Sequence, residues 1–245
     1  MGVGYTIWSP QYVNYHGGVR ALHVLKDELI KRGYSATMHY EYHTEGNFVV
    51  YPEIMAGNPL GAKHYCHWLL NSRNLPDLTF GWDKNMGSDN VLTVNIIEEN
   101  IFYPRLNKRE GIAYWVGKGS PNGFTIPDNA TQIIKEYPTT RKELADLMSS
   151  VEYVLSFDDY TSIAIEATLL GTPVLIQTEN LEASKQRLDQ SGFPTHGIFY
   201  DINDLSKAKK EVLKQHKDYL DFVKTFDELI DNFINITQLS ANSIS

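Results

Sequence analysis

The sequence predicts an α/β protein built from two parallel, doubly wound sheets. Short β-prone runs alternate with amphipathic helical segments along most of the chain. The text turns polar and irregular between Glu98 and Gly111, which is typical of a domain junction. A length of 245 residues suits two compact domains near the lower size limit. We therefore expect one domain at residues 1–100 and a second at residues 101–245.

In the first half, the run GYTIW predicts a strand, and the runs YSATMHY and FVVY predict two more. An apolar face at helical spacing predicts a helix between the first two strands, and Gly33 provides its C-terminal cap. The segment PEIMAGNPLGAKHYCHWLLN predicts a second helix, with Asn58 as N-cap and Pro59 in its first position. The run LTVNII, residues 92–97, predicts the strand that closes this sheet.

The second half repeats the alternation of strands and helices. Strands are predicted from GIAYWVG, TQIIKEY, YVLSF and TPVLIQ, and helices from RKELADLMSS and SIAIEATLL. Residues 205–234 continue as a helical segment. Strands that alternate with helices form a parallel sheet, so the functional loops should follow the carboxyl ends of the strands.

Composition excludes several classes of function. A net charge of -8 argues against a sequence-independent nucleic-acid binder, which needs a basic surface. No apolar run approaches the roughly 20 residues of a membrane span, and the first residues lack the pattern of a secretory signal. Cys66 is the single cysteine, so no disulfide framework is expected. These features favour a cytoplasmic setting.

Known cofactor and metal patterns are incomplete. The sequence has no complete Gly-x-Gly-x-x-Gly fingerprint, no Walker loop and no Gly-x-Ser-x-Gly elbow. Histidines 39 and 43, and 64 and 67, have metal-like spacing without a convergent set of partners. We therefore expect neither a metal nor a cofactor.

The segment SFDDYTSIAIEATLLGTPV, residues 156–174, carries the strongest chemical signal. A strand ends at Phe157, and a helix that begins near Thr161 or Ser162 would expose unpaired backbone N–H groups beside two hydroxyls. These donors and the positive end of the helix dipole form an anion site. Asp158 lies in the loop, where it can approach a sugar, and Glu166 lies inside the helix, where it can pair with ribose hydroxyls.

This segment resembles the Glu, seven residues, Glu motif of retaining GT-B glycosyltransferases, especially family four, with the Gly-Thr-Pro-Val that follows it. Asp158 stands where the family has the first Glu, and Glu166 is the second acid. The resemblance implies two Rossmann-like domains facing across a cleft, and it allows the last helix to return to the first domain. It also implies that Glu166 holds the donor ribose, that Asp158 contacts the donor sugar, and that Thr161 and Ser162 meet the diphosphate. Tyr160 is a further donor-binding candidate.

Two glycine-rich turns support the resemblance. Lys118 lies between Gly117 and Gly119, where the family has a Gly-Lys or Gly-Arg pair, and its ammonium would compensate the charge of the leaving diphosphate. Arg109 or Lys135 are candidates to assist it. Gly17 and Gly18 resemble the family's N-terminal Gly-Gly-Val loop, which faces the donor.

Weaker candidates complete the predicted site. His16, beside the Gly-Gly pair, and Glu53 and Asn58, near the end of the third predicted strand, are placed on the acceptor side. Tyr137 is the candidate to frame the nucleotide base.

The resemblance implies transfer of a hexosyl or deoxyhexosyl group from a nucleoside diphosphate sugar to a hydroxyl of a glycan or lipid-linked glycan. Such an enzyme retains anomeric configuration and needs no metal, and it serves polysaccharide biosynthesis. Two alternatives remain open. A GT-B sugar-nucleotide epimerase would give different products from the free donor, and a non-catalytic sugar-nucleotide or glycan-binding module would bind without transfer.

Overall fold

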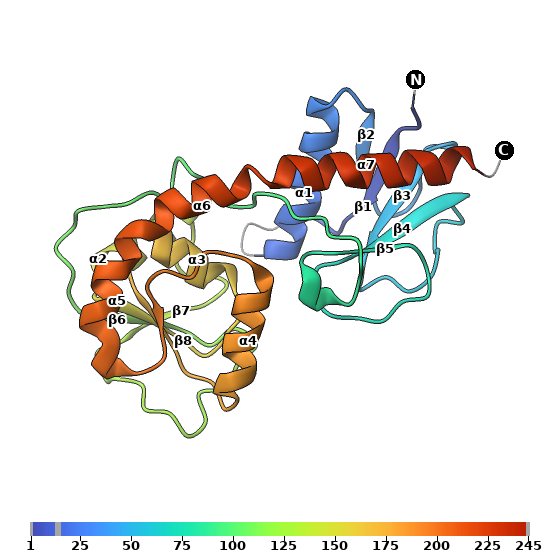
Figure 1. Ribbon diagram of the computed structural model, residues 1–245. Coiled ribbons are helices and arrows are strands. Elements are labelled where there is room, and N and C mark those ends of the chain that lie inside the picture. Colours follow the sequence, from blue (N-terminus) through green and yellow to red (C-terminus); the bar gives the residue numbers. More distant parts are fainter. Residues whose placement is uncertain (1, 13–15, 244–245) are drawn as a thin grey trace. The chain divides into compact units, whose positions relative to one another are not determined.

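The computed structural model of the protein describes residues 2–12 and 16–243 (Figure 1). The chain divides into two compact units. The first contains residues 1–96 and 223–245, and the second contains residues 97–222. Each unit has one five-stranded sheet in which all neighbouring strands are parallel. The prediction of an α/β chain with two parallel sheets is confirmed.

The sheet of the first unit has the order β2-β1-β3-β4-β5. Its strands are β1 (Tyr5–Trp8), β2 (Ala36–His39), β3 (Phe48–Pro52), β4 (His64–Leu69) and β5 (Thr79–Gly81). A short 3-10 turn, η1 (Lys84–Met86), follows β5. The chain leaves β1 for one side of the sheet and then continues on the other side with β3. The carboxyl ends of β1 and β3 therefore flank the topological switch point of this sheet.

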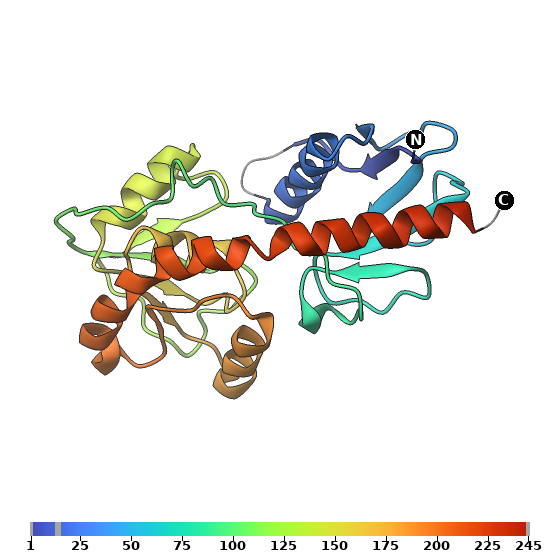
Figure 2. The ribbon, with the colours of Figure 1, turned by 45° about the horizontal axis from the view of Figure 1, so that its top comes forward.

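Two helices cover one face of this sheet: α1 (Gly17–Lys31) and α7 (Phe226–Asn242). Figures 1 and 2 show α7, in red, running along the sheet of this unit. Leu25 of α1 and Phe233 of α7 share a core with alternate strand residues such as Tyr5. The Tyr5 hydroxyl lies 2.8 Å from the Thr237 hydroxyl, which ties α7 to β1. The other face is covered by residues 55–62, so within the described residues helices cover one face of this sheet only, and the double winding predicted for it is not found.

Two predictions for this unit were wrong. The expected helix after Asn58 is strand β4, and residues 92–97 form no strand, since the isolated bridge to Gly81 is made by Val91, just before them. The first error has a clear cause. The run HYCHWL is buried on both faces of the sheet, and a continuous apolar run of that length does not distinguish a strand from a helix. The strands β1 to β3 and helix α1 are confirmed, with Gly33 in the left-handed region at φ 85°.

The sheet of the second unit has the order β10-β9-β8-β6-β7. Its strands are β6 (Ile112–Trp115), β7 (Thr131–Ile133), β8 (Tyr153–Ser156), β9 (Val174–Ile176) and β10 (Ile198–Phe199). The first four were predicted and are confirmed. The chain runs from β6 outward to β7 and returns on the other side with β8. The switch point of this sheet therefore lies between β6 and β8.

The helices of this unit are α2 (Arg141–Ser150), α3 (Ser162–Leu169), α4 (Leu181–Ser191), α5 (Leu205–Glu211) and α6 (Gln215–Val223). The 3-10 turns η2 (Ile202–Asp204) and η3 (Val212–Lys214) flank α5. Helices α2 and α3 were predicted and are confirmed, whereas α4 was not predicted. The helical segment expected at 205–234 is present but divided into α5, α6 and α7 with the turn η3 between the first two.

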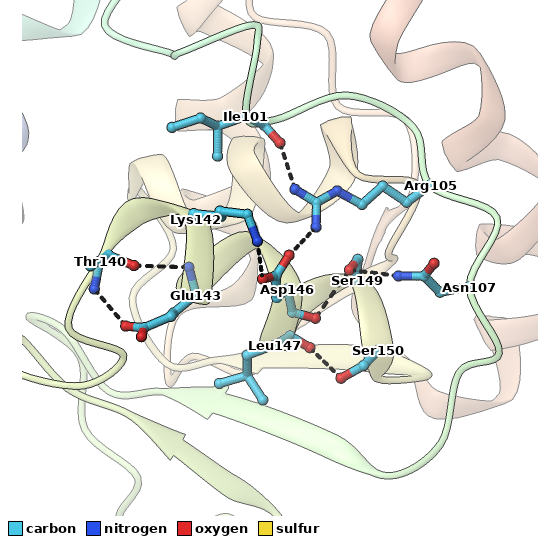
Figure 3. Close-up of polar contacts among 10 residues, drawn as sticks. All are labelled: Ile101, Arg105, Asn107, Thr140, Lys142, Glu143, Asp146, Leu147, Ser149 and Ser150. Atoms are coloured by element: carbon cyan, nitrogen blue, oxygen red, sulfur yellow. Dashed lines mark hydrogen bonds and ion pairs between the residues drawn. The ribbon is translucent and has the colours of Figure 1, made fainter.

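Helix α2 begins with a complete capping box (Figure 3). The Thr140 hydroxyl accepts from the Glu143 N–H at 3.1 Å, and the Glu143 carboxylate accepts from the Thr140 N–H at 3.0 Å. Residues 101–107 are fastened to the same helix, because Arg105 pairs with Asp146 and Asn107 donates to Ser149 at 3.0 Å. These contacts fix the first residue of the helix, Arg141, over the carboxyl edge of the sheet.

Candidate functional site

The candidate site lies at the switch point of the second sheet. Trp115 at the end of β6 pairs in register with Ser156 at the end of β8. The residues that follow these two strands are therefore neighbours, and they include Lys118 and Asp158. Ligands of open parallel sheets bind at this position, beyond the carboxyl ends of the strands where the strand order reverses.

The turn after β6 requires its glycines because of the neighbouring backbone. Gly117 adopts φ 55°, in the left-handed region, and the Gly119 N–H donates to the Val116 carbonyl at 2.9 Å. A Cβ on Gly119 would lie 1.7 Å from the Phe157 carbonyl oxygen. Gly119 therefore lets the turn close onto the end of β8.

Asp158 is held beneath this turn. Its carboxylate accepts from the Lys118 backbone N–H at 3.1 Å and from the Tyr160 N–H at 3.2 Å. The residue is 8% exposed, and this burial raises the pKa of its carboxyl above the ordinary value, although the Lys118 N–H partly offsets the shift. The structure therefore brings Lys118, Asp158 and Tyr160 together, as the sequence predicted.

Helix α3 begins directly after this carboxylate. Thr161 is its N-cap and its hydroxyl accepts from the Ile163 N–H at 3.3 Å, while Ser162 is the first helical residue. The predicted helix start is confirmed. The first turn contains no acidic residue, so no side chain of that turn neutralises the positive end of the helix. The Thr161 hydroxyl already has a role as the cap, which leaves backbone N–H groups as the principal donors for an anion.

Glu166 lies inside α3 with no exposed surface. Both of its carboxylate oxygens accept from Arg141, at 3.1 and 2.7 Å. The same guanidinium donates to Glu98 at 3.2 and 3.0 Å and stacks 4.5 Å from the Phe102 ring centroid. Sequence reasoning missed Arg141 and Glu98. The pattern Thr-Arg-Lys-Glu identifies a helix start, but nothing local relates Glu98 to a residue 43 positions later.

The remaining basic candidates lie at different places in the second unit. Lys118 has an exposed side chain, and Lys135 is exposed after β7. Arg109 donates to the Leu170 carbonyl at 2.8 Å, at the C-terminal end of α3. A guanidinium at that end of the helix cannot assist an anion at the other end, so this alternative is wrong. Tyr137, the candidate for the base, follows β7 and is 50% exposed.

Three of the predicted residues lie at the start of α1 in the first unit. His16 is the N-cap residue, and Gly17 and Gly18 are the first two helical residues rather than a loop before the helix. A Cβ on Gly18 would make an ordinary contact with Leu70, at 3.4 Å. Residues 13–15, which complete the expected loop, lie outside the described part of the chain. Arg20, in the next position but one of α1, is 4% exposed and donates to the Ile96 carbonyl at 3.3 Å.

Glu53 and Asn58 have structural contacts in the first unit. Glu53 directly follows β3, as predicted, and its carboxylate accepts from the Leu70 N–H at 3.1 Å. Asn58 is not a helix cap. Its carbonyl oxygen accepts from the Tyr51 hydroxyl at 3.0 Å and from the Ala62 N–H at 2.9 Å. Asn58 therefore organises a turn that brings the chain into β4.

Across residues 2–12 and 16–243, no group of three or more His, Cys, Asp or Glu side chains is placed to hold a metal ion. In the same part of the chain, no helix has the length and apolar character needed to cross a membrane.

The chain was compared with known proteins. Its sequence matches no protein-family model and no curated protein. Among solved structures, it is similar to an alpha-glucosyltransferase in complex with UDP and a 13-mer DNA containing a central A:G mismatch. That similarity has a TM-score of 0.45 and 9% identity over 93% of this chain and 94% of the other. A structure of TarM aligns with a TM-score of 0.37 and 11% identity, over 82% of this chain and 53% of that one.

Proposed function

We propose that the protein transfers a glycosyl group from a nucleoside diphosphate sugar to an acceptor hydroxyl. One observation carries the proposal: Lys118 and Asp158 flank the switch point of the second sheet, directly before the start of α3. An ammonium, a carboxylate and a helix N-terminus are the groups that a diphosphate joined to a sugar requires. The resemblance of residues 158–174 to the family-four motif supports the same assignment.

In the proposed reaction the diphosphate binds at the first backbone N–H groups of α3, and the exposed Lys118 ammonium compensates its charge. The acceptor oxygen forms a bond to the anomeric carbon as the bond from that carbon to the phosphate oxygen breaks. The departing phosphate oxygen takes the acceptor proton. Asp158, held next to the turn that carries Lys118, contacts the sugar. The protein then acts by positioning and charge stabilisation.

The finer features of the proposal follow from the resemblance. We propose retention of anomeric configuration, no requirement for a metal, a hexosyl or deoxyhexosyl donor, and an acceptor on a glycan or lipid-linked glycan. Glu166 would hold the donor ribose only after its hydrogen bonds to Arg141 rearrange, because both oxygens already accept from that guanidinium.

The aspartate at 158, where the family has a glutamate, favours a second candidate, a module that binds a sugar nucleotide without transferring the sugar. The two candidates differ in one measurable quantity, which is the release of nucleoside diphosphate.

The test incubates the protein with a panel of nucleoside diphosphate sugars and measures nucleoside diphosphate release, with and without glycan acceptors. Transfer predicts release that falls about 100-fold in Lys118→Ala and in Asp158→Asn, the usual scale for loss of a charge-stabilising group. Asp159→Asn is the matched control, because Asp159 is the adjacent acid and pairs with Arg187 at 3.0 Å. Binding of a sugar nucleotide without release of nucleoside diphosphate supports the binding module. Equal release by all three variants contradicts the roles proposed for Lys118 and Asp158.

A further inference from the structure

The carboxyl ends of β1 and β2 carry aromatic side chains that the proposed transfer does not use. Trp8 and His39, the last residues of these two strands, pair in register. The Trp8 indole N–H donates to the Tyr40 carbonyl at 3.0 Å. The His39 and Tyr42 rings stack, with 4.1 Å between their centroids and 33° between their planes. These contacts gather Trp8, His39, Tyr40 and Tyr42 at one edge of the first sheet, which we call the aromatic edge.

Two residues of the aromatic edge are open to water. Tyr40 is 59% exposed and Tyr42 is 58% exposed, whereas Tyr5 and Tyr51 of the same sheet have no exposed surface. A single exposed apolar side chain needs no explanation, but a group of large exposed side chains at one place is typical of a binding surface. The aromatic edge therefore offers ring surface to a ligand without any rearrangement of the fold.

The chain that carries these tyrosines is anchored to the sheet at both of its ends. It leaves β2 at His39 and enters β3 at Phe48. The Asn47 N–H donates to the Thr44 carbonyl at 3.0 Å, and the Asn47 side-chain amide donates to the Thr6 hydroxyl of β1 at 3.1 Å. Because these bonds already hold the segment, binding a ligand there costs less conformational entropy than binding it to a free loop.

The chemistry of residues 39–47, HYEYHTEGN, selects the ligand. This segment has no Lys or Arg and no aliphatic side chain. A nucleic acid or another anionic polymer is met by cations, and a membrane surface is met by cations and aliphatic side chains. The exposed carboxylates of Glu41 and Glu45 are acceptors for hydroxyl groups instead. Tyrosine rings with polar tips, beside such acceptors, match a sugar, which has C–H groups on its faces and hydroxyls at its edge.

We propose that the aromatic edge binds a neutral glycan chain, with sugar rings stacked on Tyr40 and Tyr42 and sugar hydroxyls donating to the neighbouring carboxylates. This glycan-binding surface belongs to the first unit and is additional to the donor site proposed for the second unit. Binding at the aromatic edge requires neither a nucleotide nor Lys118, so it can be tested apart from the transfer reaction.

The experiment measures binding of neutral oligosaccharides of glucose, galactose, mannose and N-acetylglucosamine to the full chain by saturation-transfer NMR, with acidic oligosaccharides of galacturonate as a second arm. Tyr42→Phe keeps the ring, whereas Tyr42→Leu and Tyr40→Leu keep an apolar side chain and remove the ring. Tyr103→Leu is the matched control, because Tyr103 is 46% exposed and lies in the second unit. Thermal unfolding of each variant reports whether it is folded.

We expect wild type, Tyr42→Phe and Tyr103→Leu to bind at least one neutral oligosaccharide with similar affinity. Tyr42→Leu and Tyr40→Leu should each bind it about tenfold more weakly at an unchanged Tm, because stacking requires the ring face. Lys118→Ala separates the two proposals, since it should lose nucleotide binding and keep glycan binding. The inference would be overturned by no glycan binding to wild type, by wild-type affinity in both folded leucine variants, by an equal loss in Tyr42→Phe and Tyr42→Leu, or by tighter binding of the acidic oligosaccharides.

Discussion

The two units share a sheet plan but differ in where their arginine clusters lie. In the second unit, Arg141 is 12% exposed and pairs with Glu166, which has no exposed surface. In the first unit, Arg32 pairs with Asp227 and Asp231, which are 67% and 65% exposed. Ions lose hydration when they are buried, so a buried cluster persists only where its partners are complete. The second unit therefore depends more strongly on the partners of its buried ion pair, which lies next to the proposed donor site.

The largest effect should come from breaking each cluster at its arginine. Arg141→Met leaves a buried carboxylate without its partner, and we expect it to lower the free energy of unfolding by about 3–5 kcal/mol. Arg32→Met removes pairs with the exposed Asp227 and Asp231 and with Glu28, which is 24% exposed and keeps contact with water, so we expect a smaller loss of about 1 kcal/mol. Urea denaturation of both variants measures the difference. Equal losses in the free energy of unfolding would show that the two arginine clusters contribute equally to stability.

Replacing one glycine of each unit by alanine should change the stability of the fold in opposite directions. At Gly119 the new Cβ would overlap the Phe157 carbonyl, and we expect a loss of about 1–3 kcal/mol or more. At Gly18, in the first turn of α1, the new Cβ has room, and we expect a gain of about 0.5 kcal/mol from lower backbone entropy in the unfolded chain. Thermal unfolding compares them. A stabilising Gly119→Ala would show that the turn does not close onto β8.

In the second unit, the pH dependence of stability should show the cost of ionising the buried Asp158 carboxyl. Burial raises the folded-state pKa of this carboxyl, so ionisation weakens the folded state relative to the unfolded state. The loss of stability is absent at pH values below the unfolded-state pKa, near 3.8, and it grows as pH rises above that value. The Tm of Asp158→Asn minus that of wild type should therefore increase between about pH 3 and pH 7. A difference that stays constant with pH would argue against the buried carboxylate.

In the first unit, His67 should make stability depend on pH in the opposite direction. The residue is fully buried, and desolvation lowers its pKa, although Asp77 at 3.5 Å acts against the shift. A lowered folded-state pKa means that the unfolded state binds the proton more tightly, so stability falls as pH drops below about 6.5. His67→Gln should reduce this acid sensitivity. The slope of Tm against pH between about 5 and 7 is the measurement, and an unchanged slope would contradict it.

Local signals predicted the second unit well. The runs that form β6, β8 and β9 are apolar and short, and Thr140 and Thr161 provide caps where α2 and α3 begin. Alternation predicted a parallel sheet, and the order that the structure shows, β10-β9-β8-β6-β7, brings Lys118 beside Asp158. The contacts that hold Glu166 could not be predicted, because Arg141 lies 25 residues before it and Glu98 still further. Such pairings depend on tertiary packing and leave no local pattern.

The first unit was predicted less well because its signals are ambiguous. The text around Asn58 and Pro59 matches a helix start, but Tyr51 and Ala62 use the Asn58 side chain to form a turn. Only the packing of β4 between β3 and β5 decides that His64–Leu69 is extended. The function of each predicted residue remains a proposal that rests on the resemblance and on the geometry at the second switch point.

Equilibrium binding of free nucleoside diphosphates tests the central claim most directly. UDP, GDP, ADP and CDP are titrated into wild type, Lys118→Ala and Lys31→Ala, the last being a 70% exposed lysine of the first unit. The account predicts that at least one of them binds, that Lys118→Ala weakens it by about tenfold or more, roughly 1.4 kcal/mol, and that Lys31→Ala leaves it unchanged. Absence of binding by wild type, or equal affinity in folded Lys118→Ala, would contradict the account.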